Sequence, residues 1–210
     1  MAKRKEIKTK IKDSHRIDLR RNQIVKGAIK VFTMKGFNNS TVREIAEAAD
    51  MTEGTLYNYI RCKEDIIYIV YDYTTKILQE ELNGAIADIE GPVERLHAAI
   101  EQTLESISTY QDLIMFLYRE SGSLKREDLY VILERENAYI NLFETLLKDY
   151  FKGRDIDLTR AKVAADILTY LPVIVSFRRW SLKRRIESME TAKKEIANFI
   201  LQGIEFIVKN

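Results

Sequence analysis

Residues 41–63 constrain the fold of this chain more than any other segment, because two helix-start signals lie only eleven residues apart. Thr41 is followed three residues later by Glu44, which is the spacing of a capping box at the beginning of a helix. The apolar residues after it recur at helical spacing and form one stripe: Val42, Ile45, Ala46 and Ala49. The segment therefore predicts two short helices that meet at a tight turn and pack closely through small alanine side chains.

The turn and the second helix are also marked by residue type. Asp50 is one of the few non-glycine residues that tolerate a left-handed backbone, and Thr52 suits the cap of the helix that follows. We expect Leu56, Tyr59 and Ile60 to face inward and Thr55, Tyr57 and Asn58 to face outward. This arrangement is typical of a helix-turn-helix, whose second helix enters the DNA major groove.

These residues resemble the DNA-binding domain of the TetR family of bacterial transcriptional regulators. The likeness is carried by Met51-Thr52-Glu53-Gly54-Thr55-Leu56-Tyr57-Asn58-Tyr59-Ile60 and Lys63, preceded by a helix over Leu19 to Lys35 and by Gly36-Phe37. Two residues depart from the family pattern: Asp50 stands where glycine is common, and Glu53 stands where a basic or neutral residue is common. Glu53 either accepts a hydrogen bond from a cytosine amino group or points to solvent.

The resemblance implies a set of DNA-contacting residues. We expect Thr41, Thr52, Tyr59 and Lys63 to contact phosphates, and Gly54 to let the backbone approach the duplex. Thr55, Tyr57 and Asn58 are expected at base edges or adjacent phosphates, and Glu53 completes the DNA-binding set.

The charge distribution supports a polyanionic partner independently. Residues 1–63 carry 15 lysines and arginines against 7 acidic residues, whereas residues 64–210 carry 19 against 25. A basic segment beside a helix-turn-helix is the expected electrostatic footprint of DNA binding. The N-terminal arm, residues 1–17, is especially basic; it either reaches DNA or is a solvated tail.

Beyond residue 63 the hydrophobic pattern is helical throughout, and the whole chain contains only two prolines. Helices are predicted over 62–83, 92–108, 110–120, 127–151, 159–185 and 190–208, with a kink at Pro172. The fold class is therefore all-α, with about nine helices: an arm (1–17), a three-helix helix-turn-helix domain (18–65) and a ligand-binding and dimerisation domain (66–210). The domain boundary should fall inside the helix that follows Lys63.

The resemblance also implies a homodimer and a small-molecule effector. The expected dimer interface consists of Val163, Ile167, Leu171, Ile174, Ile196, Phe199, Ile200, Gly203 and Ile207, although both stripes could be core. The candidate ligand-binding residues are Phe116, Tyr118, Arg119, Tyr139, Phe143, Tyr170, Phe177, Arg178 and Trp180, although aromatic residues at helical spacing are more often core.

Residues 177–185 place five basic side chains on an otherwise acidic domain. They either complement a helix dipole or form an anion site, for example for the phosphates of an acyl-coenzyme A. The body resembles the TetR subgroup linked to fatty-acid and acyl-coenzyme A metabolism, through Phe-Leu-Tyr-Arg-Glu at 116–120 and Arg-Arg-Trp at 178–180.

Enzyme chemistry is poorly represented in the sequence. There are two histidines, His15 and His97, and one cysteine, Cys62, with no glycine-rich phosphate loop and no nucleophile-elbow motif. We therefore expect no catalytic residues, no metal and no cofactor. The single cysteine and the lack of a 20-residue apolar run favour a cytoplasmic protein that does not contact membrane. The predicted function is a DNA-binding regulator, most simply a repressor that a small molecule releases from a palindromic operator. The alternative is a helical interaction, small-molecule-binding or enzymatic bundle without DNA binding.

Overall fold

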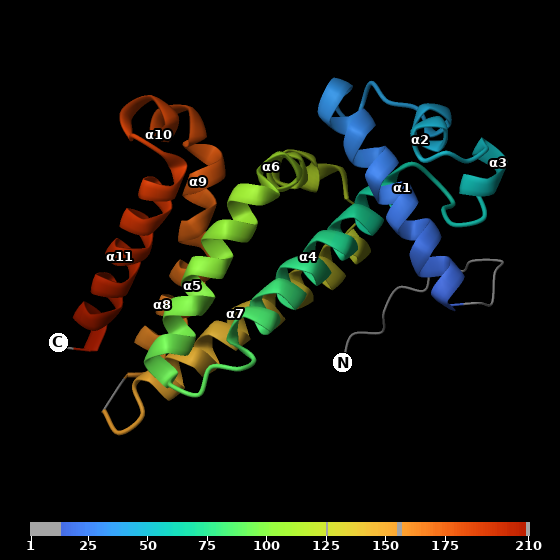
Figure 1. The fold of residues 1–210 in the computed structure, drawn as a ribbon. Coiled ribbons are helices and arrows are strands. Elements are labelled where there is room, and N and C mark those ends of the chain that lie inside the picture. The colour runs from blue at the N-terminus through green and yellow to red at the C-terminus, as the bar shows by residue number, and fades with distance from the viewer. Residues whose placement is uncertain (1–13, 125, 155–156, 209–210) are drawn as a thin grey trace. The chain divides into compact units, whose positions relative to one another are not determined.

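The computed structural model describes residues 14–124, 126–154 and 157–208, and these residues contain helices and no strand. The chain divides into two compact units (Figure 1). Unit 1 comprises the described residues up to Lys76 together with 112–135, and unit 2 comprises 77–111 with those from 136 onward. Most of the basic N-terminal arm lies outside the described residues.

Unit 1 contains the helix-turn-helix. Its elements are α1 (Ser14–Lys35), α2 (Val42–Ala48), α3 (Glu53–Leu56), the first half of α4 (Glu64–Ile86), α6 (Gln111–Glu120), the 3-10 turn η1 (Ser121–Ser123) and the start of α7 (Arg126–Tyr150). Its core is apolar and aromatic, and Phe32 from α1 stacks on Phe116 from α6 with ring centroids 4.8 Å apart. Ile24, Ile45 and Leu56 are fully buried beside them in unit 1.

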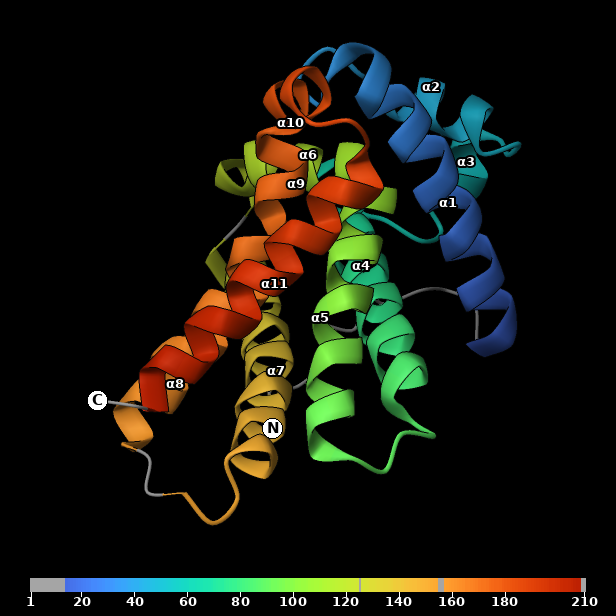
Figure 2. The same ribbon diagram turned by 60° about the vertical axis from the view of Figure 1, so that its left-hand side comes forward.

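Unit 2 is a helical bundle (Figure 2). Its elements are the second half of α4, α5 (Pro92–Thr109), the remainder of α7, α8 (Leu158–Tyr170), the 3-10 turn η2 (Leu171–Val173), α9 (Ile174–Phe177), α10 (Arg179–Arg185) and α11 (Met189–Val208). None of the described helices is long and apolar enough to cross a membrane. The helical assignment made from the sequence is confirmed.

The division between the two units falls inside α4, after Lys76, and α6 and the start of α7 pack in unit 1, where Phe116 stacks on Phe32. One helix differs from the sequence-based expectation. The predicted helix over 159–185 is interrupted twice. Pro172 lies in η2, as its missing N–H requires, and Arg178 has non-helical angles (φ −108°, ψ 14°) between α9 and α10.

The helix-turn-helix depends on a close crossing of α1 and α2. Gly27 lies on α1 where a Cβ atom would come within 2.7 Å of the Ala49 nitrogen and 2.9 Å of the Ile45 carbonyl oxygen. Both of those atoms are backbone, so they cannot move aside as a side chain would. The small side chains of Ala46 and Ala49 are only part of what allows this close packing. The opposing helix α1 must also have a glycine, Gly27, at the crossing.

We predict that Gly27→Ala lowers the free energy of unfolding by about 1–3 kcal/mol, because overpacking outweighs the gain in helix propensity. Gly84→Ala on α4 is the matched control, since its Cβ would meet nothing within 4 Å. The control should raise stability by up to about 1 kcal/mol. Thermal unfolding followed by circular dichroism measures both, and a stabilised Gly27→Ala variant would show that the crossing is not tight.

Candidate nucleic-acid interface

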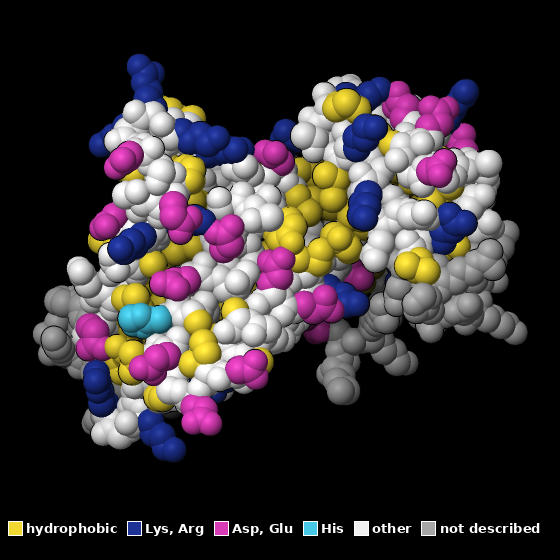
Figure 3. All heavy atoms as spheres, viewed as in Figure 1, with side chains coloured by type: hydrophobic (Ala, Val, Ile, Leu, Met, Phe, Trp, Pro, Cys, Tyr) yellow, Lys and Arg dark blue, Asp and Glu magenta, His cyan; other side chains and the backbone are white. Residues whose placement is uncertain are grey.

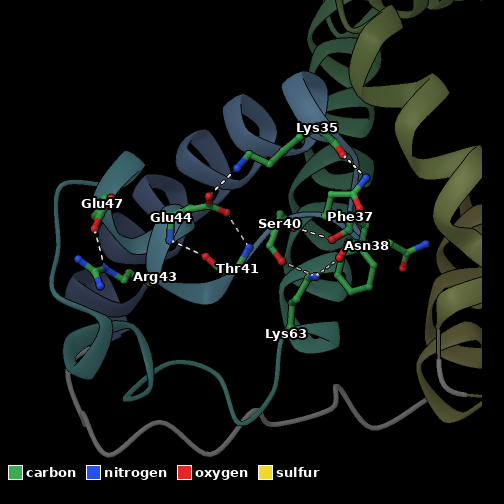
Figure 4. Close-up of polar contacts among 10 residues, drawn as sticks. Lys35, Phe37, Asn38, Ser40, Thr41, Arg43, Glu44, Glu47 and Lys63 are labelled. Atoms are coloured by element: carbon green, nitrogen blue, oxygen red, sulfur yellow. Dashed lines mark hydrogen bonds and ion pairs between the residues drawn. The ribbon is translucent and has the colours of Figure 1, made fainter.

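The first helix of the motif begins with the expected capping box (Figure 4). The Glu44 backbone N–H donates to Thr41 Oγ1 at 3.2 Å, and the Thr41 N–H donates to Glu44 Oε2 at 2.9 Å. Lys35 at the end of α1 pairs with the other oxygen of the same carboxylate. The hydrogen bonds with Lys35 and Thr41 lower the pKa of Glu44 to about 2. The Glu44 carboxylate, which connects α1 to α2, is therefore ionised at neutral pH.

The turn between α2 and α3 also has the expected chemistry. Asp50 adopts φ 54°, the left-handed conformation predicted for it, and Met51 N–H donates to the Ala46 carbonyl at 3.0 Å. Thr52 caps α3 by accepting the Thr55 N–H at 3.1 Å, and the two threonine hydroxyls lie 2.8 Å apart. The cap thus fixes both hydroxyls at the exposed beginning of the recognition helix.

The recognition segment has one buried and one exposed side. Leu56, Tyr59 and Ile60 are buried, as predicted. Thr52, Glu53, Gly54 and Tyr57 are exposed, and Thr55 and Asn58 are half-buried. Tyr57 is 47% exposed, whereas Tyr59 is only 2% exposed. The structure therefore makes Tyr59 a core residue and gives no support to the expected phosphate contact.

Lys63 has a different environment from the one expected for a phosphate ligand. Its ammonium donates to the Ser40 carbonyl at 2.6 Å and lies 3.4 Å from the Asn38 carbonyl (Figure 4). It also lies 4.3 Å from the centroid of the Phe37 ring. These contacts hold the loop between α1 and α2 against the segment that follows α3. We therefore interpret Lys63 as a positioning residue and do not carry the phosphate contact forward.

The end of the motif is tied to the next helices by a second cation. Arg61 donates from its backbone N–H to Asp65 Oδ2 at 2.9 Å, and its guanidinium donates to both oxygens of that carboxylate at 3.2 and 3.3 Å. Asp65 is fully buried at the start of α4. Asp65, with a smaller attraction from Asp128 of α7, raises the pKa of Arg61. The segment that follows α3 is consequently held to the loop between α1 and α2 and to the start of α4.

We predict that Lys63→Met weakens DNA binding without changing the slope of log Kd against log salt, because no phosphate contact is lost. A phosphate ligand would instead reduce that slope by about 0.9. Lys30→Met removes one exposed charge from α1 of the same unit and serves as the control. Fluorescence anisotropy across a salt series measures both quantities, and a slope reduced only in Lys63→Met would restore the phosphate role.

The nine expected ligand-binding residues are divided between the two units. Phe116, Tyr118 and Arg119 belong to unit 1, where Phe116 is core and Arg119 pairs with Glu120. Of those in unit 2, only Tyr139 and Phe143 lie in the interior, with ring centroids 5.6 Å apart. The other four are exposed: Tyr170, Phe177, Arg178 and Trp180.

Unit 2 holds a polar cluster that the sequence analysis missed. Glu81 of α4 accepts hydrogen bonds from the hydroxyl of Ser106 on α5 and from that of Tyr110, the residue that caps the end of α5, the latter at 2.6 Å. Thr103 of α5 pairs with the Tyr139 hydroxyl at 2.9 Å, and burial raises the pKa of Tyr139 to about 12. The available signal was the spacing of Thr103, Ser106 and Tyr110, which places polar groups on one face of the helix, among the apolar residues that are buried there.

The expected dimer residues divide into surface and core. Val163, Ile167, Ile174, Phe199 and Gly203 are exposed, whereas Ile200 is buried and Leu171 and Ile196 are half-buried within unit 2. Ile200 therefore packs in the core of its own unit, because the side of α11 that it occupies faces inward. The side chain of Ile207 lies outside the described residues. No group of three or more potential metal ligands occurs in the part of the chain that was described.

Comparison with known proteins gives similarity to two family models and to several named regulators. Residues 24–67 match the bacterial regulatory proteins of the tetR family, and residues 90–204 match the tetracyclin repressor-like C-terminal domain. The HTH-type transcriptional regulator HbdR of Aromatoleum sp. (strain CIB) is 25% identical over 148 residues, which is 70% of this chain and 65% of HbdR. The match thus spans just under two thirds of that relative.

Two further similarities agree with this result. The fatty acid metabolism regulator protein of Bacillus subtilis (strain 168) is 24% identical over 151 residues, covering 69% of this chain and 78% of the relative. The crystal structure of AibR in complex with isovaleryl coenzyme A and operator DNA superposes with a TM-score of 0.69 at 21% identity, covering 86% of this chain and 97% of AibR. That likeness shows the fold alone. Because the C-terminal model covers more than half of the chain and the N-terminal model covers the capped helix-turn-helix, this chain belongs to the TetR family of bacterial regulatory proteins.

Proposed function

We propose that this protein is a homodimeric, sequence-specific DNA-binding repressor, acting in the cytoplasm, that a small molecule releases from a palindromic operator. The observation that carries the proposal is the exposed side of the recognition segment, where Thr52, Gly54 and Tyr57 are exposed and Asn58 is half-buried. A backbone without a side chain at Gly54 permits close approach to a duplex. The repressor role is supported by the tetracyclin repressor-like C-terminal domain.

Direct reading of bases is assigned to Asn58, Thr55 and Tyr57. An asparagine side chain pairs with adenine through two hydrogen bonds in the major groove. Glu53, which is exposed at the start of α3, is positioned either to accept from a cytosine amino group or to remain in solvent. The Thr41 hydroxyl only accepts at its cap, and one hydroxyl of the Thr52–Thr55 pair keeps its hydrogen, so Thr41 and Thr52 remain our candidates for phosphate contacts.

We predict that selection from random duplexes yields a palindromic site for the wild-type protein and a relaxed site for Asn58→Ala. Loss of a bidentate base contact costs about 1–3 kcal/mol of discrimination. Asn83→Ala, an exposed asparagine of unit 2, is the control and should leave the preference unchanged. If Asn58→Ala keeps the wild-type sequence preference, Asn58 does not make the base contact. Absence of salt-sensitive binding by the wild-type protein to any duplex overturns the proposal and favours an interaction bundle instead.

The dimer interface is proposed along α8 and α9. Val163, Ile167, Tyr170, Ile174 and Phe177 recur at spacings of four and three residues and are all exposed. Such a seam is the pattern by which two helices pack against each other. Phe199 and Gly203 extend the surface on α11, where Gly203 has open space beyond its backbone. A single recognition helix reads too few base pairs for useful specificity, so two copies on paired half-sites are needed.

We predict that Ile167→Glu converts the dimer to a monomer, because the interface would bury an unpaired carboxylate. Leu133→Glu is the matched control: Leu133 is 48% exposed on α7 outside the seam, and Ile167 is 49% exposed. Sedimentation equilibrium measures the mass of each. A dimeric Ile167→Glu variant would exclude the seam from the interface.

The effector is proposed to act through the helices that run continuously from one unit into the other. Both α4 and α7 do so, and Arg135 of α7 pairs with Asp72 of α4 within unit 1. In unit 2 the same two helices carry Glu81 and Tyr139 of the polar cluster. The names of AibR's ligand and of the Bacillus subtilis fatty acid regulator support an acyl-coenzyme A or a related metabolite as the effector.

A further inference from the structure

Helix α10 is an unusual element of unit 2, because none of its residues is buried. It forms the bend between α9 and α11 at one end of that unit (Figures 1 and 2). The bend carries five basic residues, and no acidic residue occurs between 171 and 186: the five are Arg178, Arg179, Lys183, Arg184 and Arg185. Lys and Arg side chains gather over α10 in Figure 3. Because α10 contributes no buried residue to the core, packing does not explain why it is so basic.

Four of these cations have no carboxylate partner among the described residues: Arg178, Lys183, Arg184 and Arg185. By contrast, Lys148 and Lys193 of the same unit are engaged with neighbouring glutamates. Three of the four lie in the last turn of α10, where the helix dipole favours them. A dipole effect of about 0.3–1 kcal/mol accounts for a cation or two, but it does not account for an aromatic residue among them.

That aromatic residue is Trp180, the only tryptophan of the chain, and it is 67% exposed. Trp180, Lys183 and Arg184 are spaced i, i+3 and i+4, so they share one face of α10. An indole face beside two cations provides a surface for stacking an aromatic ring and groups for binding phosphate. Because α9 ends at Phe177 and Arg178 is non-helical, this face does not continue the apolar seam of α8 and α9.

The acidic residues around α10 favour a small anion over a large polyanionic surface. Five of the 19 basic residues of 64–210 lie in this bend, whereas that segment also contains 25 acidic residues. Glu187 and Glu190 follow α10 directly and are exposed. At physiological salt, charges are screened beyond about 8 Å. A small anion held on α10 therefore meets mainly the cations, while a duplex or a lipid surface extends over carboxylates. In addition, paired bases in a duplex are not free to stack on Trp180.

We propose that Trp180, Lys183 and Arg184 bind the phosphorylated adenosine group of a nucleotide, with the base stacked on the indole and the phosphates on the two cations. The proposal rests on the proposed effector response and deepens it, because it assigns the residues that bind the adenosine phosphate part of the effector. The same group occurs in free nucleotides and at one end of coenzyme A. Arg178 and Arg185 contribute positive charge at the edges of this site.

The experiment titrates the full-length protein with ADP, coenzyme A and inorganic pyrophosphate. Trp180 fluorescence reports stacking without interference from another tryptophan, and calorimetry gives the dissociation constants. We expect saturable quenching by ADP or coenzyme A with a Kd tighter than about 1 mM, and weaker binding of pyrophosphate. Equal Kd values assign the site to nucleotides in general, and a tighter Kd for coenzyme A assigns it to the coenzyme.

Three variants separate the parts of the site. Lys183→Gln with Arg184→Gln should weaken both ADP and pyrophosphate about tenfold or more, since charge-assisted hydrogen bonds are lost. Trp180→Ala should weaken ADP about tenfold and leave pyrophosphate unchanged. Lys152→Gln with Lys162→Gln removes two exposed charges elsewhere in unit 2 and should change neither. Because α10 has no buried residue, all variants should keep the wild-type melting temperature.

The proposal is overturned if ADP and coenzyme A both fail to bind, or if the Lys183 and Arg184 variant binds them as tightly as the wild-type protein. It is also overturned if that variant loses instead the affinity for operator DNA or for anionic phosphatidylglycerol vesicles. Operator binding measured in parallel keeps the two proposals apart. Salt-sensitive operator binding without nucleotide binding rejects only the α10 site, whereas nucleotide binding without operator binding rejects only the repressor.

Discussion

The close crossing of α1 and α2 is the constraint on which the recognition surface depends. The backbone of α2 lies where a side chain at Gly27 would be, so the two helices touch along their main chains. This contact fixes α2, and the turn at Asp50 then fixes the direction of α3. A change of a few tenths of an ångström at the crossing would be transmitted to the exposed side chains of the recognition segment, since packed helices have little room to adjust.

Polar contacts then hold the ends of the motif. The Lys35–Glu44–Thr41 group closes the start of α2, and Lys63 returns to the carbonyl groups of the loop before it. Arg61 connects the other end to the buried Asp65 of α4. These cations are close to the expected DNA surface, but their contacts are with groups of the protein itself. Basic residues near a recognition helix therefore cannot all be counted as phosphate ligands, because some of them position the helix.

Unit 2 has two chemically different exposed surfaces. Along α8 and α9 a row of exposed apolar residues is regularly spaced among exposed polar ones, whereas along α10 the exposed residues are basic with one tryptophan. The break at Arg178 separates these two surfaces, so one chain segment supplies two chemically distinct faces. The same unit contains the hydrogen-bonded cluster of Glu81, Ser106 and Tyr110, in which Ser106 is buried and the other two residues are half-buried. A buried polar group such as the Ser106 hydroxyl is stabilised when it is paired, as it is here.

The sequence by itself determined the helices, the capping box at Thr41, the cap at Thr52 and the left-handed turn at Asp50, because each depends on interactions within a few residues. The kink at Pro172 has the same local origin. Only the tertiary structure decided that Lys63 binds carbonyl groups, that α6 packs in unit 1 and that Tyr170, Phe177 and Trp180 are exposed on unit 2. Those outcomes depend on contacts between residues far apart in the chain, and the spacing of residues along one helix carries no information about which distant surface meets them.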